Sequence, residues 1–249
     1  MEENRKGPGI FYAVVGVATL VVAIIGATFA YFSASAEATG EQITGGTNNE
    51  LAAALNLTVH KLDWSNNGGA VSNDLVPADF GATELAAKNI QSALDAKCVN
   101  AGYTGCHLWK IDANTTQTVA NASVLLSLST NAAVKDNWRY VVFTADGGTV
   151  GDMTDPELTV TGLPTVAGNV QGSLKTPLVN LDIHNNAQML AGTAETAPSN
   201  TYYLLVYLAN IESSQNGQNG GTSETGTYEG TVTMNAAGGQ VKATFTAAA

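Results

Sequence analysis

The residues of this chain that could do chemistry are few and far apart. The three histidines, His60, His107 and His184, are isolated in the sequence, each in or beside a stretch that alternates like a β-strand. Hydrolases and zinc enzymes need several such groups at fixed spacing, yet the chain has no His-Glu-x-x-His, no Gly-x-Ser-x-Gly and no glycine-rich phosphate loop. We therefore predict no enzyme activity, no catalytic residue, no metal ligand and no cofactor.

Three aspartates in the stretch DGGTVGDMTD could offer oxygen ligands to calcium. These are Asp146, Asp152 and Asp155. The spacing of an EF-hand loop and its closing glutamate are absent, so the stretch is better explained as a solvated turn.

The only two cysteines, Cys98 and Cys106, lie close together in KCVNAGYTGCH. The asparagine and glycines between them allow a tight turn, and in an exported chain such a pair predicts a disulfide. A loop this short would stabilise the fold by roughly 2–3 kcal/mol. A metal site is a weaker alternative because only His107 is near, and a free buried pair is the other.

Three Asn-x-Ser/Thr sequons begin at Asn56, Asn114 and Asn121. A chain rich in asparagine and threonine produces such triplets by chance, so the sequence leaves their use as N-glycosylation sites open.

The composition favours a secreted β-protein. Charged residues make up 12% of the chain, glycine occurs 26 times and the net charge is −11. Nucleic-acid binding requires clustered lysine and arginine, so we predict no nucleic-acid partner.

An uncharged stretch, residues 7–36, follows the mixed-charge start MEENRK. A helix over residues 10–36 would be about 40 Å long, enough to cross a hydrocarbon core about 30 Å thick. Arg5 and Lys6 precede it, which places the N-terminus in the cytoplasm. We predict that residues 1–36 are a signal or hydrophobic helix, that residues 10–36 contact the membrane at least transiently, and that the rest is extracellular or at the cell surface.

The end of this stretch, GATFAYFSASA, contains a candidate cleavage site between Ala30 and Tyr31. Thr28 and Ala30 meet the small-x-small requirement of signal peptidase. Residues 20–46 resemble the signal region of the TasA and camelysin family, which has Gly-[Ala/Gly]-Thr-aromatic-Ala-aromatic-Ser at this point. The resemblance implies a secreted β-rich protein that self-assembles into extracellular fibres of a biofilm matrix. Camelysin is described as a metalloprotease, so the resemblance also raises an enzyme hypothesis, for which this chain offers no zinc ligand set.

Two alternatives use the same stretch differently. Lys6-Gly7 and Gly9-Ile10-Phe11 loosely resemble a type IV prepilin site, after which a retained helix would enter a filament core, although the usual early glutamate is missing. Without cleavage, the stretch would anchor a surface binding or adhesion domain.

Behind this stretch, residues 37–52 are a polar linker or mature N-terminal arm, and residues 53–249 form one domain. Alternation predicts strands at residues 53–62, 107–112, 124–130, 137–145, 158–163, 178–184, 226–235 and 240–247. The continuous apolar run 201–211 predicts a central strand that is covered on both faces. The glycine-rich turn at residues 236–239 predicts a hairpin between the last two strands. Leu85, Ile90 and Leu94 recur at helical spacing, which predicts one helix at 82–96 within an insertion spanning about 79–97.

This order of elements predicts a mainly β protein. Strand follows strand with almost no helix between, which favours an antiparallel β-sandwich of the jelly-roll or immunoglobulin-like kind, with the helical insertion and the N-terminal hydrophobic helix added. The layout, with a cysteine loop after the insertion, also resembles exported TasA-like domains.

Such a sandwich has edge strands that a fibre protein can use for assembly. If Ala30 is the last signal residue, the mature chain begins with an assembly arm of large apolar and small residues, namely Tyr31, Phe32, Ser33, Ala34, Ser35 and Ala36. We predict that this arm completes the sheet of another copy, so the partner is the protein itself as a homopolymer.

Overall fold

The computed structural model describes residues 33–37, 55–62, 75–78, 85–100, 103–115, 118–132, 135–147, 157–164, 170–184, 188–189, 200–210, 226–236 and 239–248. The predicted hydrophobic helix therefore lies outside the described residues, as do the cleavage site and most of the linker. In the described part, no helix is both long and apolar enough to cross a membrane.

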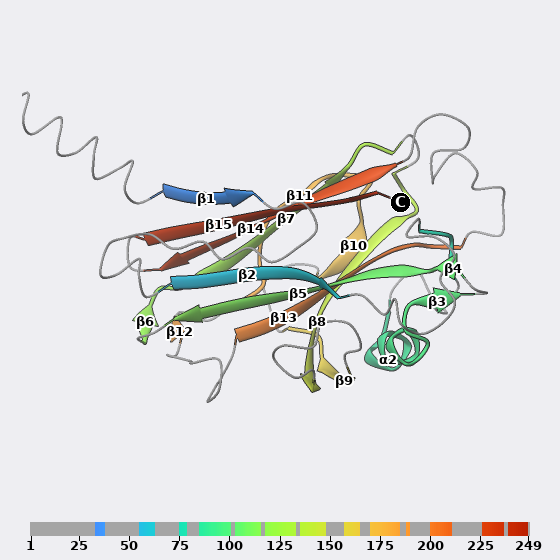
Figure 1. Ribbon diagram of the computed structural model, residues 1–249, viewed down its shortest axis with the longest axis horizontal. Coiled ribbons are helices and arrows are strands. Elements are labelled where there is room, and N and C mark those ends of the chain that lie inside the picture. Colours follow the sequence, from blue (N-terminus) through green and yellow to red (C-terminus); the bar gives the residue numbers. More distant parts are fainter. Residues whose placement is uncertain are drawn as a thin grey trace, which may run out of the picture.

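Two β-sheets face each other (Figure 1). Sheet A has the order β1-β15-β14-β7-β11, formed by Ser33–Glu37, Gly239–Ala248, Thr227–Ala236, Ser123–Thr130 and Leu178–Asp182. Sheet B has the order β10-β8-β13-β5-β2, formed by Gln171–Ser173, Trp138–Gly147, Asn200–Leu208, Cys106–Thr115 and Leu55–Leu62. A further strand, β9 (Leu158–Gly162), pairs with β8.

Short strand pairs complete the described β-structure. β3 (Val99–Asn100) pairs with β4 (Tyr103–Thr104), and β6 (Val119–Ala120) pairs with β12 (Gln188–Met189). The predicted mainly β, antiparallel character with one helix is thus confirmed for the described residues. One pairing departs from it, because β1 runs parallel to β15.

The core lies between the two sheets because alternate residues of each long strand point inward. Leu55, Leu57 and Val59 of β2 are buried, as the alternation of that strand predicts. Large aromatic side chains cross the gap between the sheets, with ring centroids 4.4 Å apart for Trp109 and Phe245. This interdigitation fixes the spacing of the two layers.

β13 is the central strand of sheet B, between β5 and β8. Its residues from Tyr202 to Leu208 are all buried, which agrees with the continuous apolar pattern predicted to be covered on both faces. The outer cover includes the helix α2 (Ala87–Asp95), whose Ile90, Ala93 and Leu94 are buried in a second hydrophobic cluster with β5, β8 and β13.

The predicted start of the helix at residue 82 is wrong for the part described. Ala86 has extended backbone angles and is the N-cap, so Leu85 and Ala86 precede the helix. No side chain caps this end, and no acidic residue lies in the first turn. Instead, the Leu85 amide donates a hydrogen bond of 2.7 Å to Oε1 of Gln171 in β10, a contact that local sequence patterns do not reveal.

Candidate assembly site

The outer edge of β15 is the site where the predicted arm lies. β15 is paired with β14 along its whole ten-residue length, in the hairpin predicted from the glycine-rich turn. On its other side it pairs with β1 over five residues, from Ser33 opposite Gln240 to Glu37 opposite Thr244. Within the described residues, positions 245–248 of β15 have no strand on that side.

The sequence of β15 explains why this edge is a regular strand. Val241, Ala243 and Phe245 point into the core, whereas Thr244 and Thr246 lie on the outer face. β-branched and aromatic residues at alternate positions suit a half-buried strand. Where β1 does not cover it, such an edge has a row of backbone N–H and C=O groups that another strand can pair with.

Phe245 anchors the β14–β15 hairpin to the core. It lies opposite Gly230, and a Cβ built on Gly230 would be only 2.1 Å from the Phe245 ring. The missing side chain of Gly230 therefore makes room for the ring, which reaches Trp109 of sheet B. The edge offered by β15 is held in place by this packing.

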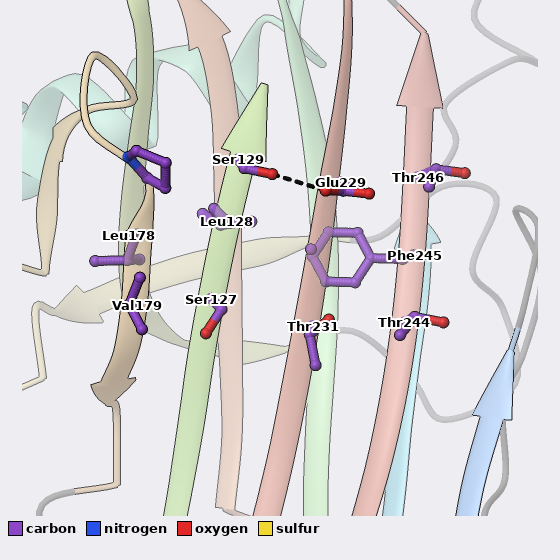
Figure 2. Close-up of a pocket in the computed structure, with 12 residues that line it drawn as sticks. Ser127, Leu128, Ser129, Leu178, Val179, Glu229, Thr231, Thr244, Phe245 and Thr246 are labelled. Carbon is purple, nitrogen blue, oxygen red and sulfur yellow. Dashed lines mark hydrogen bonds between the residues drawn. The ribbon is translucent and has the colours of Figure 1, made fainter. Parts of the chain in front are cut away.

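The outer face of sheet A beside the edge carries hydroxyl groups (Figure 2). Thr231 lies opposite both Ser127 and Thr244, so three hydroxyl side chains form a row across three strands. Glu229 accepts a hydrogen bond of 2.9 Å from Ser129. These residues and the β11 segment with exposed Val179 border a shallow hollow of about 730 Å³. Glu229 is the one titratable group among its lining residues, which provides no acid–base pair for catalysis.

A polar cluster lies on the outer face of sheet B. Lys110 and Asp112 form a largely buried ion pair at 3.0 Å, and Thr201 donates a hydrogen bond of 2.6 Å to Asp112. His60 lies opposite Lys110 on β2. Burial lowers the pKa of His60; the Asp112 carboxylate acts to raise it and the Lys110 ammonium to lower it. Burial, then the charges of Asp112 and Asp146, raise the pKa of Tyr203.

The other two histidines have separate environments. His107 is buried, with Nδ1 3.1 Å from the hydroxyl of Tyr228, which also accepts a hydrogen bond of 2.6 Å from Trp109. His184 Nδ1 is 2.7 Å from the hydroxyl of Tyr202. The histidines are therefore not brought together, and the described residues contain no group of three or more metal-ligating side chains.

The remaining predicted site residues divide between described and undescribed parts. Cys98 and Cys106 form a disulfide with a Cα–Cα distance of 5.0 Å, and it joins the end of α2 to the start of β5. Ala30, Tyr31 and Phe32 lie outside the described residues. The rest of the arm, Ser33, Ala34, Ser35 and Ala36, belongs to β1.

Sequence analysis missed the pairing of β1 with β15 of the same chain. The stretch SASAE is short and consists mostly of small residues, so its own pattern does not select a partner strand. The regular alternation of β15 was the available signal. It predicts a strand, but it does not select which segment pairs with the outer edge of that strand, or in which direction.

Comparisons with known proteins leave the family open. No protein-family model matches this chain, and no curated protein matches it. Among solved structures, it is similar to a family 123 glycoside hydrolase from Clostridium perfringens at 9% identity, with a TM-score of 0.23, over 77% of this chain and 27% of that chain. The chain thus spans about a quarter of that hydrolase, and a likeness this weak carries no argument about fold or activity.

Proposed function

We propose that this protein is an exported, non-enzymatic structural subunit of an extracellular filament, assembled as a homopolymer by exchange of the β1 arm. The observation that carries the proposal is the parallel addition of Ser33–Glu37 to the open edge of β15. A strand that joins a sheet only at its edge forms the same backbone hydrogen bonds on the same edge of another copy.

The connection after β1 is long enough for this exchange. Seventeen residues separate Glu37 from Leu55, and an extended chain of that length spans at most about 55 Å. The arm therefore has the reach to pair with a neighbouring β15 while its own domain stays folded. Pairing within one chain and between chains has nearly equal contact energy, so subunit concentration and repeated end-to-end addition decide between them.

We further propose that the sandwich is of the jelly-roll kind rather than immunoglobulin-like. The chain changes sheet from β5 to β7, from β7 to β8, from β10 to β11, from β11 to β13 and from β13 to β14. Jelly rolls cross between sheets at most of their connections, whereas immunoglobulin-like domains retain more hairpins within a sheet.

A pair of cysteines placed in the β1–β15 register tests the exchange. Ser35 lies opposite Lys242, so Ser35→Cys combined with Lys242→Cys places two thiols across the arm interface. In filaments, oxidation should link neighbouring subunits and give a ladder of covalent oligomers on a denaturing gel without reductant. If intact filaments gave no covalent oligomers but only monomers with the disulfide inside one chain, arm exchange would be contradicted.

The matched control for this test moves one cysteine along β15. Ser35→Cys with Thr246→Cys keeps the same arm residue but places its partner beyond the paired stretch, which ends at Thr244. This variant should give no ladder. A ladder of equal intensity would mean that the linkage reflects random collisions between chains.

A further inference from the structure

The fold gathers all three Asn-x-Ser/Thr sequons at one end of the sandwich. Asn56 lies near the start of β2 and Asn114 near the end of β5, where the two residues are direct cross-strand partners. Asn121 lies between β6 and β7, and β6 is at the left end of the molecule in Figure 1, as are the start of β2 and the end of β5. Residues from three parts of the sequence are thus presented at the same pole.

The three asparagines differ in how accessible they are. Asn121 is exposed and has a left-handed backbone with φ of 54°, in the turn that leads into β7. Asn56 is exposed on β2, the edge strand of sheet B. Asn114 is half-buried on β5, which has β2 on one side and β13 on the other. A bulky glycan requires an exposed position, which Asn121 and Asn56 provide.

The hydroxyl residues of the two exposed sequons are also accessible in part. Ser123 is half-buried at the start of β7, and its Oγ accepts a hydrogen bond of 3.3 Å from Asn235, which leaves its own proton available. Thr58 is half-buried and lies on the same outer face of β2 as Asn56, because side chains two residues apart on a strand point the same way.

We propose that Asn121 and Asn56 are N-glycosylation sites, whose substrate is an oligosaccharide linked to a membrane lipid through pyrophosphate. The side-chain amide nitrogen forms a bond to the anomeric carbon of the first sugar and releases one proton to the surrounding water. The bond from that carbon to the lipid pyrophosphate breaks, and the lipid pyrophosphate leaves with the electron pair. The reaction needs no oxidant or reductant.

Asn114 stays unmodified in this proposal. Its direct partner is Asn56, and strands pair about 4.5–5.5 Å apart, so two glycans at these positions would occupy the same space.

The glycosylated pole would lie beside the start of β1, since Ser123 pairs with Asn235, Asn235 with Gln240, and Gln240 with Ser33. The inference rests on the export contained in the proposed function, because the lipid-linked donor is used on the far side of the membrane.

The test is peptide mass spectrometry on the protein recovered from the surface of its own cells, with fragmentation that preserves glycans. Peptides that contain Asn121 and Asn56 should carry a hexose-containing mass increment. Ser123→Ala should remove the increment at Asn121 and leave that at Asn56, which also shows that the variant folds and is exported. Ser123→Thr should retain both.

Asn180 is the matched control within the chain. It is exposed and left-handed, with φ of 51°, but Asp182 stands where a sequon needs a hydroxyl residue. It should remain bare, and equal modification of Asn180 would overturn sequon-directed glycosylation. If Asn121 and Asn56 carry no glycan in protein recovered from the cell surface, this proposal is overturned and export stands. If the protein carries no glycan and is found only in the cytoplasm, both export and this proposal are overturned.

Discussion

At the scale of single residues, the core depends on a glycine that makes room for an aromatic ring. Phe245 fills the position where Gly230 would carry a side chain and packs against Trp109 in the facing sheet. Tyr228, two residues before Gly230, links the same region to His107 and Trp109 through its hydroxyl. A substitution that changes the side-chain volume in this region therefore disturbs the packing of both sheets.

Gly230→Ala should destabilise the fold by about 1–3 kcal/mol, because its new methyl group overlaps the Phe245 ring and the ring is closely packed. Urea unfolding followed by tryptophan fluorescence measures the loss. Gly172→Ala is the control, since its Cβ would meet the hydroxyl and ring of Tyr140 at ordinary contact distances, the nearest being 3.4 Å. Equal losses in the two variants would show that the Phe245 contact is not the cause.

The lowered pKa of His60 predicts a pH dependence of stability. In the unfolded chain His60 titrates near the ordinary histidine pKa of about 6.5, and in the folded protein its pKa is lower. Between the two values the unfolded chain binds more protons, so the free energy of unfolding falls as pH drops below about 6.5 and levels off below the folded pKa.

His60→Gln should remove this part of the pH dependence. The urea midpoints of the variant and the original protein, measured at several pH values between 7.5 and 5, should diverge as a function of pH. Lys110 and Asp112 remain in both proteins, so their charges cancel in the comparison. If the urea midpoints of the two proteins changed in parallel with pH, a shifted pKa at His60 would be contradicted.

At the scale of elements, α2 protects an edge of sheet B. The Gln91 side chain donates a hydrogen bond of 3.0 Å to the Leu158 carbonyl and accepts one of 2.8 Å from the Val160 amide. A single amide group thus pairs with β9 as a neighbouring strand would. This contact satisfies two backbone groups on an edge that could otherwise pair with another chain.

Gln91→Ala should cost about 1–3 kcal/mol, since it leaves two β9 backbone groups without their partner. Hydrogen exchange at the Val160 amide should accelerate more than exchange in β13. Ser92→Ala is the matched control on the exposed face of the helix, where the Ser92 hydroxyl donates a hydrogen bond of 3.0 Å to the Lys88 carbonyl of the same helix. Unchanged exchange at Val160 in the Gln91 variant would argue against edge protection.

At the scale of the whole molecule, we expect assembly and folding to be separable. β1 joins sheet A through its pairing with β15 alone, whereas the long strands of the two sheets pair with one another without it. Deletion of residues 31–39 from the mature protein should therefore leave folded monomers that form no filaments. Electron microscopy and size-exclusion chromatography measure the two outcomes.

A deletion of equal length in a polar stretch between β13 and β14 is the control for the arm deletion. Removal of residues 214–222 takes nine residues from a glycine-, asparagine- and glutamine-rich stretch and should leave filament formation intact. Undiminished filaments after deletion of residues 31–39 would overturn the arm as the assembly element.

Much of this β-architecture could be predicted because burial on one face imposes a period of two on each strand. Leu55, Leu57 and Val59 show that period, and the β14–β15 hairpin follows from its turn residues. The start of α2 could not be predicted, because the Leu85 amide is satisfied by Gln171 from a distant strand rather than by a local cap. The polar cluster of His60, Lys110 and Asp112 was also hidden, since it depends on the register of β2 against β5.

The sequence by itself determined the mainly β class, the central position of β13 and the proximity of the two cysteines. These depend on local spacing and on apolar periodicity, which any fold must respect. Only the tertiary structure decided that the arm lies parallel to β15, that the histidines are kept apart and that the sequons share one pole. These depend on pairing between segments distant in the chain, where many registers satisfy the local pattern and only packing of the two sheets selects one.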